Sequence, residues 1–188
     1  MTYKTYTGKL ETKTHGGYRN LKSYQGATII YDLTVQFCNC YIDKRSRTHD
    51  QMVQAARSGQ QNIAEGSQAS ATSKKSELKL LGVARASLEE LLNDYQNYLR
   101  QHGLTPWDKD SNEARGVRTL AYTTNRSYET YMSYAKDPQS FANCIICLTH
   151  QANYLLDHQL DSLEKTFIEQ GGYTENLFKK RLDNRRRI

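Results

Sequence analysis

Apolar residues recur every three or four positions along most of this chain, the spacing that places them on one face of an α-helix. This pattern predicts four long helices, at about 18–43, 46–65, 74–101 and 138–170. No segment keeps the alternation of apolar and polar residues that a half-buried strand shows. We therefore predict an all-α fold, an antiparallel four-helix bundle with an additional helical or irregular insertion at 104–137.

Capping residues and helix breakers predict where these helices begin and end. Ser46 or Thr48 can cap the second helix. Gly66 is placed to end that helix, because glycine adopts the left-handed C-cap conformation at little cost. Gly103 is expected to end the third helix, and Pro138 suits the first turn of the last one.

Two segments flank the predicted bundle, which occupies residues 18–170. Residues 1–17 are rich in Gly, Thr and Lys, so we predict a flexible N-terminal arm. Residues 171–188 begin with two glycines and are then strongly charged, which predicts a basic C-terminal tail. The tail is expected to project from the bundle. The helical spacing of Phe178 and Leu182 leaves open a short amphipathic helix that docks on the bundle or on a neighbouring subunit.

The first and last predicted helices are apolar over more than one face. In the first helix, Ile30, Leu33 and Phe37 lie beside the main apolar stripe and widen it. This is more apolar surface than a monomeric bundle needs, so we expect the chain to form a homo-oligomer.

The net charge of +6 is distributed unevenly along the 188 residues. Residues 1–47 carry a net charge of +5, residues 48–170 carry −3 and residues 171–188 carry +4. Basic ends on a mildly acidic middle favour contact with a polyanion. The alternative is that these charges only keep the surface soluble.

The sequence shows neither a membrane segment nor a secretory signal. No run approaches the roughly 18 apolar residues that a transmembrane helix requires, and the first residues are polar. We expect a cytoplasmic protein without membrane contact, whose four cysteines are reduced thiols.

The cysteines are the first candidates for metal binding. Cys38 and Cys40 lie two positions apart on one predicted helix, so they point roughly 200° apart at about 100° per residue. Cys144 and Cys147 share a face of another predicted helix. A tetrahedral four-thiolate site needs both pairs to converge. We therefore expect the cysteines to pack as small apolar residues and predict no metal.

The histidines form no catalytic pattern in the sequence. Di-metal sites in helix bundles use Glu-x-x-His, but Cys147 stands three residues before His150 and Leu155 stands three residues before His158. The sequence also lacks a glycine-rich phosphate loop and a nucleophile–base motif. We predict that the protein is not an enzyme and uses no cofactor.

The most specific local pattern spans the end of the second helix and the first half of the third. A short loop, 67–73, joins the two helices and brings their polar groups to one end of a hairpin. Arg85 is expected to form a charge-assisted hydrogen bond with Glu65 or Glu77. We interpret these groups, with Asn62, as a structural latch; the alternative is that they have a direct functional role.

This pattern resembles the signature of the bacterial four-helix bundle family that includes proteins encoded in 23S rRNA intervening sequences. The matching residues are Asn62 to Gly66, Ala84, Ser87, Leu88 and Glu90. The resemblance covers about residues 20–102 and, more weakly, the last helix. The region around Trp107 and the basic tail resemble the variant of the family that carries a C-terminal suffix.

The resemblance implies a bundle that assembles into a ring-shaped homopentamer. It also implies kinship with the accessory variability proteins of diversity-generating retroelements. Those proteins bind nucleic acid and a reverse transcriptase and catalyse nothing themselves.

We therefore predict a non-catalytic accessory protein that binds nucleic acid, with RNA as the first candidate, as a ring-shaped homo-oligomer. Phosphate contacts are expected from Lys44, Arg45 and Arg47, between the first two helices. Further contacts are expected from the tail residues Lys179, Lys180, Arg181, Arg185, Arg186 and Arg187. The alternative is a protein-binding scaffold whose basic tail docks on an acidic partner.

Overall fold

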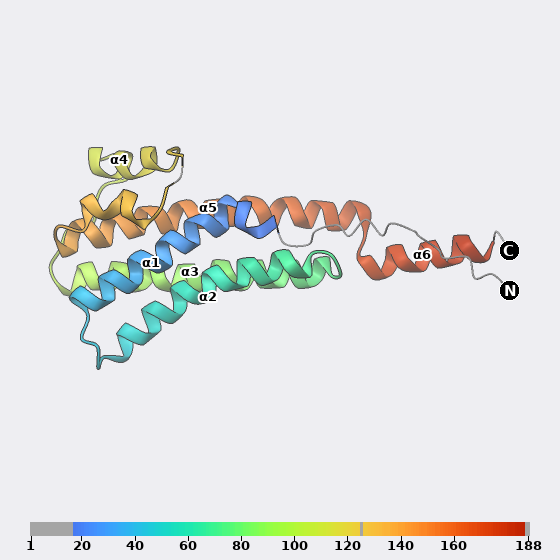
Figure 1. Ribbon diagram of the computed structural model, residues 1–188, viewed down its shortest axis with the longest axis horizontal. Helices are drawn as coiled ribbons and strands as arrows, with labels where there is room; N and C mark the ends of the chain where they lie inside the picture. Colours follow the sequence, from blue (N-terminus) through green and yellow to red (C-terminus); the bar gives the residue numbers. More distant parts are fainter. Residues whose placement is uncertain (1–16, 125, 187–188) are drawn as a thin grey trace, which may run out of the picture.

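The computed structural model describes residues 17–124 and 126–186, and every regular element in these ranges is a helix. The four long helices are α1 (Lys22–Tyr41), α2 (Arg47–Ala69), α3 (Lys74–Gln101) and α5 (Pro138–Gln170). α1 and α3 each pack against both α2 and α5, as Figure 1 shows, so the four helices enclose one hydrophobic core. We call these elements the four-helix core. The predicted all-α class is confirmed.

The shorter elements lie before, between and after these helices. A 3₁₀ turn, η1 (Gly17–Asn20), precedes α1 and replaces the first turn of the helix predicted there. Between α3 and α5 lie α4 (Asn112–Leu120) and a 3₁₀ helix, η2 (Tyr128–Tyr134). Both pack on α5, and Figure 1 shows α4 on the side of α5 away from α2. The insertion thus adds helical structure to the outer side of α5.

Aromatic side chains from three helices meet near one end of the core, where α1 and α3 end and α5 begins. The Phe37 ring lies edge-to-face against the rings of Tyr95, Tyr98 and Phe141, at centroid distances of 5.0, 4.9 and 5.6 Å. This arrangement suits the ring quadrupoles. Tyr95 is fully buried and donates its hydroxyl hydrogen to Thr34 Oγ1 at 3.1 Å, so its polar atom is satisfied within the core.

Gly66 does not end the second helix, so that prediction is wrong. α2 continues to Ala69, and Gly66 is buried where α2 crosses α3. A Cβ atom at Gly66 would lie 3.4 Å from the Glu77 carbonyl oxygen and 3.4 Å from Leu80 Cβ. The glycine therefore permits close packing of two helices rather than a left-handed turn.

The C-terminal segment forms a helix, α6 (Tyr173–Arg185), with no buried residue. Figure 1 shows it extending from the end of α5, beyond the four-helix core. Every buried residue of α5 itself precedes Asp157, so the chain becomes progressively exposed toward α6. None of the described helices combines the length and the apolar character needed to cross a membrane.

Candidate nucleic-acid interface

The first predicted basic cluster lies in the connection between α1 and α2. Lys44, Arg45 and Arg47 are exposed, and none of them forms an ion pair with another described residue. Ser46 Oγ accepts a hydrogen bond from the Thr48 backbone N–H at 3.2 Å and caps α2. The cap orders the connection, and the three cations remain free to meet an anion.

The second predicted cluster lies on α6. Its described members are all exposed: Lys179, Lys180, Arg181, Arg185 and Arg186. Successive residues turn by about 100° along a helix, so these cations point to several sides of α6 rather than to one face. The sixth predicted member, Arg187, lies outside the described residues.

The helix α6 is favoured by charges at its two ends. Glu175 lies in the first turn, and its Oε2 accepts a hydrogen bond from the Gly172 backbone N–H at 3.0 Å. The cations follow in the middle and at the C-terminal end. An acidic first turn and a basic last turn both interact favourably with the helix dipole and so stabilise the helix. A segment with no buried face can therefore still be helical.

A single chain does not bring the two clusters together. Figure 1 shows the α1–α2 connection at one end of the molecule and α6 at the opposite end. The 33 residues of α5 lie along this distance. At 1.5 Å per residue such a helix is about 50 Å long. A ligand that contacts both clusters of one chain must therefore be extended. A compact ligand could contact both kinds of cluster only if they came from different copies of the chain.

Two residues of the local pattern at the end of α2 and in α3 take part in a polar contact between these helices. Asn62 Nδ2 donates hydrogen bonds to the Ser58 carbonyl oxygen at 2.9 Å and to Ser58 Oγ at 3.1 Å. Ser58 Oγ in turn lies 2.9 Å from Ser87 Oγ. The signature residues Asn62 and Ser87 are thus joined through Ser58. Glu65 and Glu90 are exposed and take no part in this contact.

The expected pairing of Arg85 with Glu65 or Glu77 is wrong. Arg85 Nε donates to Asp157 Oδ1 of α5 at 2.9 Å, and Arg85 Nη1 donates to Glu89 Oε2 at 2.6 Å. Arg85 lies eleven residues into α3, and this places it about 16 Å along the helix from the hairpin end. The carboxylates within its reach are therefore on α3 and α5.

Two separate arrangements, with three ion pairs between them, replace the predicted latch. Asn153 Nδ2 donates to Glu89 Oε2 at 3.1 Å, so Arg85, Glu89, Asn153 and Asp157 connect α3 to α5. Glu77 is buried at the hairpin end, where its Oε2 accepts from Lys74 Nζ at 2.9 Å. The first arrangement joins α3 to α5, whereas the Lys74–Glu77 pair lies within the first turn of α3.

The core cysteines are placed for packing. Cys38 and Cys144 are fully buried, whereas Cys40 is exposed. Burial raises the pKa of the Cys38 thiol to about 12, and it raises the pKa of the Cys144 thiol further. In the described part of the chain, no three His, Cys, Asp or Glu side chains gather as a metal-ligating group.

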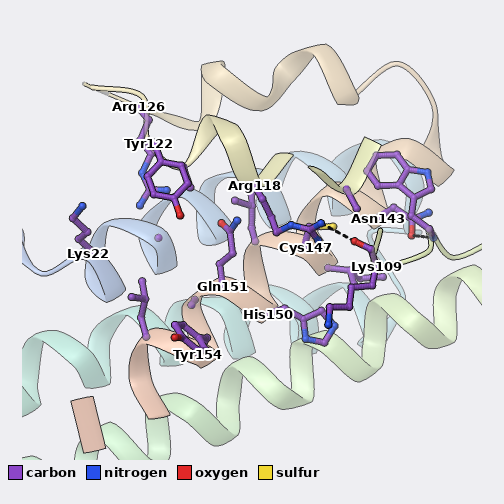
Figure 2. Close-up of a pocket in the computed structure, with 18 of the residues that line it drawn as sticks. Lys22, Lys109, Arg118, Tyr122, Arg126, Asn143, Cys147, His150, Gln151 and Tyr154 are labelled. Atoms are coloured by element: carbon purple, nitrogen blue, oxygen red, sulfur yellow. Dashed lines mark hydrogen bonds between the residues drawn. The ribbon is translucent and has the colours of Figure 1, made fainter. Parts of the chain in front are cut away.

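A cleft that the sequence did not predict lies where the insertion packs on α5 (Figure 2). Its volume is about 700 Å³. The walls come from the start of α1, the 104–111 loop, α4 and the first half of α5. Its apolar lining includes Ala114, Ile146, Leu148, Ala152 and Leu155. We call this the α4–α5 cleft.

The cleft has a strongly basic lining. It contains four cationic side chains, Lys22, Lys109, Arg118 and Arg126, against a single carboxylate, Asp108. None of the four forms an ion pair with another described residue. Arg118 Nη2 donates to the Lys109 carbonyl oxygen at 2.7 Å, and this hydrogen bond connects α4 to the preceding loop. The cleft is therefore suited to an anion.

Aromatic side chains accompany these cations. Trp107 is partly buried, whereas Tyr122 is 88% exposed and Tyr154 is 63% exposed. Figure 2 shows Tyr122 and Tyr154 on either side of Gln151. Cations combined with accessible aromatic rings are typical of surfaces that bind single-stranded nucleic acid, because bases stack on the rings while the cations meet phosphates.

The sequence contained part of the signal for this cleft. The insertion carries the only tryptophan of the chain and several arginines, among them Arg118 and Arg126. Their spacing follows no motif, however, and Lys22 is more than eighty residues away in the chain. Only the packing of α4 and α1 against α5 brings these residues together.

Comparison with known proteins identifies no relative of this chain. No protein-family model, no curated protein and no solved structure matches the chain. The resemblance to the 23S rRNA intervening-sequence family therefore stays a prediction from the signature residues.

Proposed function

We propose that this protein is a non-catalytic accessory protein of the cytoplasm that binds nucleic acid, with RNA as its ligand. The observation that carries the proposal is α6, a helix without a buried residue. Its four cations and the cation of its C-cap residue, Arg186, are all exposed. Neutralising phosphates with such cations releases counterions, which favours binding without sequence readout. Lys44, Arg45 and Arg47 would supply a second contact at the other end of the molecule.

In this proposal the four-helix core is an antiparallel four-helix bundle, and five copies form a ring. The mutual packing of its four helices supports the bundle. Exposed apolar side chains near the C-terminal end, Ile168, Tyr173, Leu177 and Phe178, support self-association, because exposed apolar patches mark interaction sites. A ring would also bring basic clusters from different copies into one field. Light scattering should give five times the chain mass of 21.7 kDa; a mass of one chain would exclude the ring.

The proposal is tested by neutralising α6. The variant replaces Lys179, Lys180, Arg181, Arg185 and Arg186 with glutamine. The matched control neutralises five exposed cations of other elements: Arg57, Lys75, Lys79, Arg100 and Lys136. The two variants have equal net charge, so they separate a local contact from the overall field.

Binding of each protein to single-stranded RNA is measured over a range of salt concentrations. The log–log salt slope should fall by about 0.7 for each lost phosphate contact in the α6 variant, so two to four lost contacts change it by roughly 1.4–2.8. The control should keep nearly the wild-type slope. Equal slopes in wild type and α6 variant would remove α6 as the nucleic-acid contact.

A protein-binding scaffold is the second candidate function. Phe178 and Leu182 are 61% and 37% exposed beside the cations of α6, a combination that also suits an acidic protein surface. The accessory variability proteins of diversity-generating retroelements, to which the resemblance implies kinship, bind a reverse transcriptase. Nucleic acid absorbs more strongly at 260 nm than protein does, so the absorbance ratio at 260 and 280 nm of the purified protein separates the two candidates. An absorbance ratio equal to that of protein without nucleic acid, together with no RNA binding at low salt, would favour the scaffold.

A further inference from the structure

We infer that the α4–α5 cleft binds one unstacked nucleotide, with the base against the apolar lining and the phosphate at the basic rim. This inference rests on the proposed function and specifies it, because a base is available in this way only in a single strand or in a free nucleotide. The cleft, and not α6 alone, would then determine which form of nucleic acid is bound.

The size and lining of the cleft suit a base with its ribose. Its volume of about 700 Å³ falls within the roughly 300–1,000 Å³ of small-molecule sites. Ala114, Ile146 and Leu155 offer apolar surface to a planar ring. A double helix presents its bases stacked and paired, so placing one of them in the cleft costs a few kcal/mol that a single strand does not have to supply.

The positive charge of the cleft lining indicates a ligand that carries negative charge. Lys22, Lys109, Arg118 and Arg126 face one carboxylate, that of Asp108. The Asp108 carboxylate already accepts a hydrogen bond from the Asp110 backbone N–H, at 2.7 Å through Oδ1. Cations around an apolar cavity repel one another unless an anion lies between them. A phosphate group provides that anion and several acceptor oxygens.

One polar side chain distinguishes a base from an aliphatic ligand. Gln151 lines the cleft and forms no hydrogen bond with another described residue. Figure 2 shows its amide end pointing away from Tyr154, toward the side of the cleft on which Tyr122 and Arg118 lie. An amide both donates and accepts, which matches the edge of a base. The alkyl chain of a fatty acid offers this amide no hydrogen-bond partner.

The same chemistry is available from two sources, a free nucleotide and an unpaired nucleotide within an RNA strand. The sole tryptophan, Trp107, lines the cleft and serves as an internal reporter. Its fluorescence is titrated with uridine monophosphate, with a single-stranded uridine oligonucleotide, with an RNA duplex and with decanoate. Quenching by the oligonucleotide, well below the concentration at which the monophosphate acts, identifies the strand. Equal affinities identify the free nucleotide.

The test variant is Gln151→Leu combined with Lys22→Gln, which alters the base-edge and phosphate contacts and removes no described hydrogen bond or ion pair. The control is Arg57→Gln combined with Gln96→Leu, two exposed positions outside the cleft. The test variant should bind the nucleotide ligand about tenfold more weakly, the change that corresponds to roughly one lost net hydrogen bond. The control should bind as wild type, and thermal melting should show that both variants are folded.

The outcomes separate this inference from the proposed function. Failure of the proposed function is seen when wild-type protein binds no oligonucleotide at low salt. Failure of the inference is seen when the oligonucleotide binds but Trp107 fluorescence and the test variant's affinity do not change. Equal binding of duplex, or quenching by decanoate alone, would also overturn the inference.

Discussion

Asn143 of α5 holds the loop that carries Trp107, because its Oδ1 accepts a hydrogen bond from the Trp107 backbone N–H at 2.8 Å. The same amide donates to the carbonyl oxygens of Thr105 and Gln139, at 3.0 and 2.9 Å. Asn143 is only 2% exposed, so these partners replace water completely. One buried side chain therefore sets the path of the insertion over α5 and the position of the α4–α5 cleft.

Replacement of Asn143 by leucine should destabilise the protein and loosen this loop. Leucine has a similar size but accepts and donates no hydrogen bond, so the Trp107 N–H loses its partner. We expect a loss of about 1–3 kcal/mol in the free energy of unfolding, together with a red shift of Trp107 emission. The control Asn93→Leu changes an exposed residue of α3 and should stay within about 0.5 kcal/mol of wild type. Equal stability of the two variants in urea would contradict this role of Asn143.

Two glycines inside helices should respond to alanine in opposite directions. At Gly59, a Cβ atom would lie 2.7 Å from Leu88 Cδ2 and 2.8 Å from Leu88 Cγ, so the Leu88 side chain must move. At Gly82, no atom lies within 4 Å of the same position. Gly59→Ala should cost about 1–3 kcal/mol through overpacking. Gly82→Ala should gain roughly 0.5–1 kcal/mol through helix propensity. A denaturant midpoint for Gly59→Ala equal to or above that of wild type would exclude close packing at Gly59, and a lowered midpoint for Gly82→Ala would contradict the open space there.

The long helices were predictable because their apolar spacing and their end residues agree. α3 and α5 span the ranges predicted from the sequence, with Ser73 and Asp137 as N-caps and glycines after their last turns. Gly66 shows the limit of this reasoning: a glycine followed by a polar stretch has the same sequence signal whether it ends a helix or permits a close crossing. Only the position of α3 decides between the two.

The candidate sites were predictable in proportion to how local they are. The cations of α6 are neighbours in sequence, so their grouping was visible. The sequence left a helix open only as an alternative that docks on the bundle or on a neighbouring subunit, whereas α6 has no buried residue. The α4–α5 cleft combines Lys22 with Arg118 and Arg126, which only tertiary packing brings together. The predicted partners of Arg85 were wrong for the same reason, because its actual partner Asp157 lies 72 positions away in the chain.

The Arg85 contact should stabilise the protein modestly. Arg85 and Asp157 side chains are 29% and 53% exposed, so water screens their attraction. A double-mutant cycle with Arg85→Gln and Asp157→Asn should give a coupling of about 0.2–1 kcal/mol. The matched cycle of Arg85→Gln with Glu65→Gln should give none, because Glu65 is exposed and forms no described ion pair. Coupling to Glu65 instead of Asp157 would restore the hairpin latch.

The buried thiols should make stability fall at alkaline pH. Burial raises the pKa of Cys38 from its ordinary value of 9.0 to about 12, and burial raises the pKa of Cys144 above that. Above about pH 9 the unfolded chain therefore releases thiol protons that the folded chain keeps. The unfolded state then binds fewer protons, so the free energy of unfolding decreases as the pH rises.

Each such thiol should lower stability by about 1.4 kcal/mol per pH unit between its unfolded and folded pKa values. Urea unfolding of wild type and of Cys38→Ala combined with Cys144→Ala, measured between about pH 9 and 10, should show a shallower pH dependence in the double variant. The variant loses packing energy at every pH, so only the slopes are compared. Cys40→Ala serves as the control, because Cys40 is exposed and should leave the wild-type slope unchanged. Parallel slopes in the wild type and the double variant would mean that Cys38 and Cys144 reach solvent and ionise in the folded protein, which the packing around them does not permit.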